Sequence, residues 1–290
     1  MNEEERIKLT HQISETVNSL SANFQNFGFP ERGQRVNRDA LERVFRDRLI
    51  DSLNARVTDW QWRSELTFDT TNLINAGFIS FDIAGHNEDE VALIELKYVP
   101  TIIDGGQHTI PNDRYAFPYD LLKDCIKLEL ALNHGLVDGV NCTPRDCNEG
   151  ECKPVLGLAI GLTNHQKFWQ PPAQMRNWAR NSWELLGNAN FPAGPFTCRT
   201  DTKRLENAIF RNQRCHLSLS MAWLWSWLDY SEDARLPEHA RAFRFILLSP
   251  EVNNNGKRLY THDLDDPAFI PFLKPETREK WQNKHILRAG

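Results

Sequence analysis

The chain has 290 residues, of which 40% are apolar and 25% are charged, a composition typical of a globular protein with a sizeable core. Its formal net charge of −5 argues weakly against indiscriminate binding to nucleic acid but does not exclude a local basic patch. No apolar run approaches the roughly 18 to 20 residues that span a bilayer. The acidic first residues lack the apolar core of a signal peptide, so we expect a cytoplasmic protein with mainly reduced cysteines.

The first third of the chain predicts two helices and a strand. An exposed helix with a modest apolar stripe is expected over 3–24, and a second helix over 38–53 has apolar residues at helical spacing on one face. Glu42 lies beside that face. A strand is expected over 57–68, with Glu65 among its apolar residues.

The most informative stretch is a predicted strand hairpin over 80–99, with a polar turn at 86–90. Its second strand, Val91 to Val99, is apolar except for Glu95 and Lys97. Such a run is typical of a strand buried on both faces, and side chains two residues apart share one face of a strand. Burying a charge without partners costs several kcal/mol or more. Two charges on one face of an interior strand, with Asp82 on the neighbouring strand, therefore need a physical reason. The simplest alternative is a salt bridge between Glu95 and Lys97 on a half-exposed strand, but the flanking apolar residues argue against exposure.

Beyond the hairpin, a long loop over 102–117 leads to a helix over 119–133 that is apolar over a wide arc and should be largely buried. Four polar residues of this helix are available to a site at the hairpin: Asp120, Lys123, Asp124 and Lys127. A buried strand follows over 155–162, and two more strands are expected over 217–227 and 243–248.

No linker cleanly divides the chain. We expect a helical arm over 1–36, a core over 37–165 and a C-terminal extension over 166–290 that packs on the core. The whole is expected to form one compact domain.

Asp82 is followed by twelve intervening residues and then by Glu95-Leu96-Lys97. Placed on two adjacent strands after a helix that carries Glu42, this pattern resembles the PD-(D/E)XK nuclease superfamily over roughly residues 37–162. Phe81 stands where many members have a proline. The resemblance implies a restriction-endonuclease-like α/β fold, in which a mixed central β-sheet is flanked by helices, with additional C-terminal strands and helices.

The resemblance also implies roles for individual residues. Asp82 and Glu95 would bind a divalent metal ion, Mg²⁺ or Mn²⁺, and the backbone carbonyl of Leu96 would complete its inner shell. Lys97 would be the catalytic lysine that positions or activates the attacking water. This assignment agrees with elementary chemistry, because Mg²⁺ prefers hard oxygen ligands and a neighbouring lysine can steer a water molecule.

Members of the superfamily often add a further acid from the first helix and a polar residue from the helix after the hairpin. Glu42 and Glu65 are the two candidates for the acid, and the sequence leaves both open. For the polar residue we favour Lys123.

These residues predict a metal-dependent endo- or exodeoxyribonuclease that acts in restriction, repair or defence against foreign DNA. DNA is then the expected partner, no membrane is involved, and a homodimer that cuts both strands is compatible with the sequence. The alternative is a nuclease-like fold that serves as a non-catalytic nucleic-acid or protein binding module. The acidic net charge and the absence of a recognisable DNA-reading motif keep this alternative open.

Three further features are weaker. Cys142, Cys147 and Cys152 are evenly spaced and could hold a structural Zn²⁺, but the usual spacing of two is absent, so reduced thiols are favoured. His108 in the long loop could touch substrate, although such a histidine is more often only solvated. Basic residues group within 32–46, 203–214 and 278–288, as phosphate contacts would require, but most charge runs are solvated faces.

Overall fold

The computed structural model describes residues 1–24, 38–69, 78–88, 90–100, 102–104, 107–109, 117, 121, 124–125, 127–129, 131–132, 153–169, 190–191, 194–196, 217–219, 223–234, 236 and 238–250. Its helices are α1 (Glu3–Ser19), α3 (Arg38–Arg56) and the short α6 (Glu238–Arg241), with 3-10 turns at Leu20–Asn23 and Gln166–Phe168. Its strands are β1 (Gln61–Asp69), β2 (Phe78–Asn87), β3 (Glu90–Val99), β4 (Ile102–Asp104), β5 (Gln107–Thr109), β6 (Lys153–Thr163), β7 (Asn190–Phe191), β8 (Gly194–Phe196), β9 (Leu217–Leu219), β10 (Trp223–Glu232) and β11 (Ala242–Pro250).

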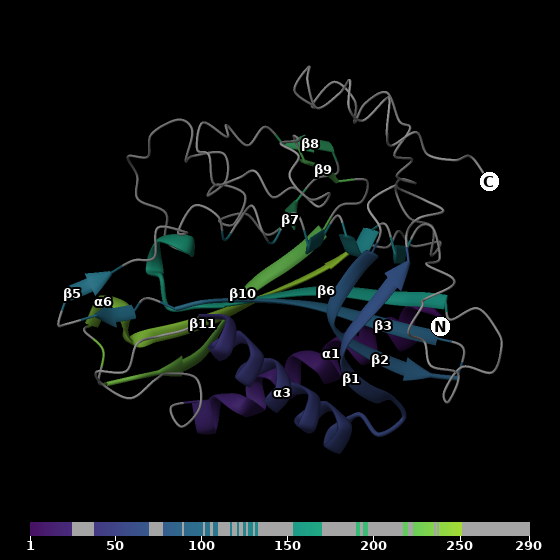
Figure 1. Cartoon of the computed structure of the whole chain (residues 1–290), viewed down its shortest axis with the longest axis horizontal. Helices are drawn as coiled ribbons and strands as arrows, with labels where there is room; N and C mark the ends of the chain where they lie inside the picture. The colour runs from purple at the N-terminus through teal and green to yellow at the C-terminus, as the bar shows by residue number, and fades with distance from the viewer. Residues whose placement is uncertain are drawn as a thin grey trace.

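Seven of these strands form one sheet in the order β1-β2-β3-β6-β11-β10-β7. β3 and β6 run parallel, and every other neighbouring pair in the sheet is antiparallel. Figure 1 shows α1 and α3 side by side across one face of this sheet. The predicted α/β fold with a mixed central sheet and packed helices is therefore confirmed.

The two faces of β6 pack against different helices. Leu158 and Ile160 belong to the hydrophobic cluster that also contains residues of α1 and α3. Gly161 faces the other way, where an added Cβ would lie 2.7 Å from the Phe117 ring and 3.2 Å from Leu121. The missing side chain lets this second layer approach the strand closely, so the centre of the sheet is covered on both faces.

The first helix is less exposed than the sequence predicts. Ile13 and Val17 are completely buried, and Leu9 lies on the same stripe at the i, i+4 spacing of a helix face. Ile7, an apolar residue near the start of the same helix, is 63% exposed instead. The 3–24 segment is thus part of the core, and its start is fixed by a capping box between Asn2 and Glu5.

Three predicted elements differ in detail from the structure. β1 begins at Gln61 rather than 57, because the chain turns where the Trp60 N–H donates to the Val57 carbonyl. The expected loop over 102–117 contains the hairpin β4–β5. The expected strand over 217–227 is divided into β9 and β10, which belong to different sheets.

Hydrophobic residues from both halves of the chain share one cluster, which includes Phe45 of α3, Tyr98 of β3, Tyr230 of β10 and Phe245 of β11. The predicted boundaries at 36 and 165 stay predictions. Among the described helices, none is both long and apolar enough to cross a membrane.

Candidate active site

The site lies where β2 and β3 separate. Their register runs from Asn87 opposite Glu90 to Ile83 opposite Ile94 and ends there, while β2 stays paired with β1 down to Phe78. We call residues 95–99 the open end of β3. On its other edge this segment remains paired with β6 over its whole length.

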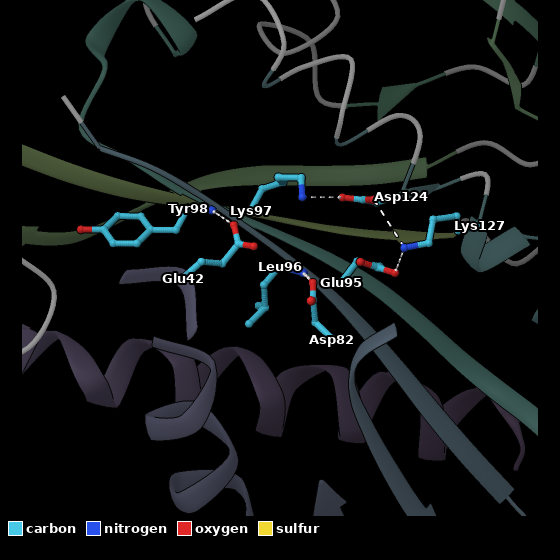
Figure 2. Close-up of polar contacts among 8 residues, drawn as sticks. All are labelled: Glu42, Asp82, Glu95, Leu96, Lys97, Tyr98, Asp124 and Lys127. Carbon is cyan, nitrogen blue, oxygen red and sulfur yellow. Dashed lines mark hydrogen bonds and ion pairs between the residues drawn. The ribbon is translucent and has the colours of Figure 1, made fainter. Parts of the chain in front are cut away.

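At the open end of β3, where β2 no longer pairs with it, two carboxylates accept hydrogen bonds from the backbone of β3. The Leu96 N–H donates to Asp82 Oδ2 at 2.8 Å, and the Tyr98 N–H donates to Glu42 Oε2 at 2.9 Å, as Figure 2 shows. Buried backbone N–H groups require an acceptor, so these acids complete the strand as well as lining its edge. The N–H and C=O of one residue point to the same side of an extended strand, which places the Leu96 carbonyl on this edge too.

Glu95 and Lys97 project from β3 to the layer formed by the helical residues between 117 and 132. Lys97 Nζ lies 3.8 Å from Asp124 Oδ2. Lys127 Nζ lies 3.9 Å from Asp124 Oδ1 and is hydrogen-bonded to Glu95 Oε1. The two lysines therefore flank one carboxylate, and one of them also holds Glu95 (Figure 2).

Burial and neighbouring charges shift the pKa values of Glu95 and Lys127. Glu95 is only 3% exposed, and burial raises the pKa of its carboxyl well above the usual range, against the opposing charge of Lys127. Burial also lowers the pKa of Lys127, but the charges of Glu95 and Asp124 outweigh that effect and raise it. A neighbouring cation therefore favours the ionised form of Glu95, in opposition to the effect of burial.

Glu42 is the second acid with a perturbed pKa. Burial raises its pKa to about 7, although Lys97 and the hydrogen bond from the Tyr98 N–H act in the opposite direction. The charges of Asp82 and Asp124 add to the rise, which places Glu42 electrostatically within the same cluster. α3 directs Glu42 to β3 because Leu41 and Phe45, on either side of it in the sequence, are buried in the core.

Glu65 occupies a different environment. Its side chain is 65% exposed and accepts a hydrogen bond of 2.7 Å from Arg46 Nη1. Its backbone φ is 54°. Ser64 and Leu66 pair with Ile83 and Phe81 of β2, but Glu65 between them is not paired with Asp82. The Glu65 side chain therefore lies at the surface, whereas Glu42 lies at the open end of β3.

The helix after the hairpin contributes two residues that the sequence offered only as alternatives. Asp124 and Lys127 reach the site, whereas the favoured Lys123 lies outside the described residues. Their i, i+3 spacing puts them on one helix face. Their sequence neighbours Cys125 and Leu128 are completely buried, so this part of the helix is packed against the sheet. The sequence does not single out this face, because the helix is apolar over a wide arc.

Other sequence predictions concern residues outside the described part of the chain. These include the cysteines at 142, 147 and 152 and the basic groups at 203–214 and 278–288. His108 lies in β5, opposite Ile103, and its side chain is not among the described ones. The zinc site and these phosphate contacts stay predictions.

The donor set suits a hard divalent cation. As they stand, no three His, Cys, Asp or Glu side chains of the described residues converge closely enough to hold a metal ion. Mg²⁺ nevertheless needs only one or two carboxylates, because it keeps several waters. The ammonium of Lys127 already forms an ion pair with the Glu95 carboxylate, so this carboxylate accepts a cation in the structure. Asp82, Glu95 and the Leu96 carbonyl would hold such an ion, with Glu42 beside them.

Comparison of the chain with protein-family models, with curated proteins and with solved structures finds no match. The site therefore has to be interpreted from its own geometry.

Proposed function

We propose that this protein is a metal-dependent nuclease of the PD-(D/E)XK type that hydrolyses phosphodiester bonds in DNA. One observation carries the proposal: Asp82, Glu95 and Lys97 gather at the open end of β3, together with Glu42 from a helix. Hard-oxygen donors beside a lysine are what phosphodiester hydrolysis requires, because negative charge develops on the phosphoryl oxygens.

Each residue has a task in this reaction. Asp82, Glu95 and the Leu96 carbonyl bind the cation, which when bound neutralises phosphoryl charge and makes a water more acidic. Lys97 is 24% exposed on its side chain, so its ammonium can donate to a phosphoryl oxygen or to the attacking water. Asp124, 3.8 Å from that ammonium, holds it toward the site. The second layer of helical residues excludes bulk water from Glu95.

The direct test is a cleavage assay on plasmid DNA, single-stranded DNA and RNA with Mg²⁺ or Mn²⁺. We expect metal-dependent cleavage of DNA by the wild type. Lys97→Ala should reduce the rate by a factor of about 100 or more, in line with the loss of a group that assists proton transfer or charge neutralisation.

Lys8→Ala is the matched control, because Lys8 is an exposed lysine of α1. It should cut like the wild type. Wild-type protein that cuts none of the three substrates contradicts the proposal. Cleavage by Lys97→Ala at the wild-type rate would show that another part of the chain holds the active site.

The alternative, a nuclease-like binding module without catalysis, is favoured by one observation. Each acid of the cluster is already engaged, Asp82 and Glu42 by backbone N–H groups and Glu95 by Lys127. A module of this kind would bind DNA in a mobility-shift assay and leave it intact with either metal.

A further inference from the structure

The residue that the proposed reaction does not use is Lys127. Its ammonium is bonded to Glu95, which the proposed function assigns as a metal ligand. The side chain is held from a second direction, since Nζ lies 5.4 Å from the centre of the Phe81 ring. The lysine is therefore positioned on the carboxylate where the divalent ion would bind.

A second carboxylate is within reach of the same ammonium. Asp124 Oδ1 lies 3.9 Å from Lys127 Nζ, on the same helix face, and Asp124 is 3% exposed on its side chain. If Lys127 leaves Glu95, it can stay paired by closing on Asp124. With the divalent ion on Glu95 and the lysine on Asp124, neither a buried cation nor a buried anion is left without a partner, so the exchange costs little free energy.

We propose that Lys127 is an internal competitor for the divalent cation: it neutralises Glu95 in the metal-free protein and moves toward Asp124 when the ion binds. This inference rests on the proposed function for the identity of Glu95 as a ligand. Because the lysine competes for Glu95, the protein should bind the divalent ion less tightly than the same carboxylates would without Lys127. In the metal-free protein, Glu95 keeps a cationic partner.

The experiment measures Mn²⁺ binding by calorimetry on the full chain, without nucleic acid. Lys127→Met removes the charge and keeps most of the apolar stem. It should bind Mn²⁺ at least about tenfold more tightly than the wild type, because charges about 4 Å apart interact strongly at the edge of a protein. Its melting temperature in chelator should fall, and the increase on adding Mn²⁺ should exceed that of the wild type.

Two variants serve as controls. Lys127→Arg keeps the charge and should bind Mn²⁺ like the wild type. Lys8→Met removes an exposed lysine of α1. It tests whether a change in net charge alone raises the affinity for Mn²⁺. If Lys127→Met does not fold, Lys127→Gln makes the same measurement. General damage to the site would weaken binding, so tighter binding cannot arise from misfolding.

Two of the possible outcomes separate this inference from the proposed function. Wild type that binds Mn²⁺, with Lys127→Met binding it no more tightly, overturns the inference alone. Wild type that binds Mn²⁺ as described but does not cut DNA overturns the nuclease and leaves the competitor in place. Wild type with no affinity for divalent ions overturns both.

Discussion

The four acids around β3 form two pairs with different kinds of partner. Asp82 and Glu42 accept hydrogen bonds from backbone N–H groups of β3, and those groups cannot move without disrupting the sheet. Glu95 and Asp124 are paired with lysines, whose side chains can be rearranged. The difference teaches that one side of the site is fixed by the fold, while the other is held only by side-chain ion pairs.

The fixed pair can be tested through Glu42, where we expect the largest effect on stability. Its folded-state pKa of about 7 lies above the usual value of 4.5, so the folded protein holds this proton more tightly than the unfolded chain. The stabilisation is complete below pH 4.5 and is lost as the pH rises through 7. A shift of this size corresponds to about 3 kcal/mol.

Urea unfolding in chelator at several pH values between 4.5 and 8 measures this loss. Glu42→Gln keeps an acceptor for the Tyr98 N–H but cannot ionise, so its free energy of unfolding should decline less by about that amount. Parallel curves for wild type and variant would show that Glu42 does not titrate in this range.

The hairpin and its charges were predictable because their signals are local. The segment 91–99 is apolar except for Glu95 and Lys97, and the two-residue period of a strand puts these two side chains on one face whatever surrounds them. The second helix was equally clear, since its apolar residues repeat at helical spacing along α3. Both predictions depend only on residues that are close to one another in the sequence.

What the sequence could not supply depends on contacts between distant residues. Glu42 meets Tyr98 across 56 positions, and nothing local indicates that β2 leaves β3 at that point. The wide apolar arc of the helix at 119–133 leaves its rotation undetermined, so the sequence could not single out Asp124 and Lys127 among the polar residues of this helix. The break between β9 and β10 is likewise hidden by an alternating pattern that runs through it.

A smaller effect on stability is expected at Asp82. Asp82→Ala leaves the buried Leu96 N–H without its acceptor and should lower the free energy of unfolding by about 1 to 3 kcal/mol. Asp82→Asn can still accept through its amide oxygen and should lose much less. Both should show a reduced Mn²⁺-induced increase in melting temperature. An unchanged increase would remove Asp82 from the ligand set, and equal losses in the two variants would contradict the backbone role.

The smallest effect is expected at Glu65, which marks the outer limit of the site. Its ion pair with Arg46 is exposed, so Glu65→Gln should change the free energy of unfolding by less than about 0.5 kcal/mol. Glu65→Gly should be no less stable than Glu65→Gln, because glycine adopts the backbone φ of 54° without steric cost. Both variants should cut DNA at the wild-type rate. A large loss of cleavage with unchanged stability would instead make Glu65 the third acid.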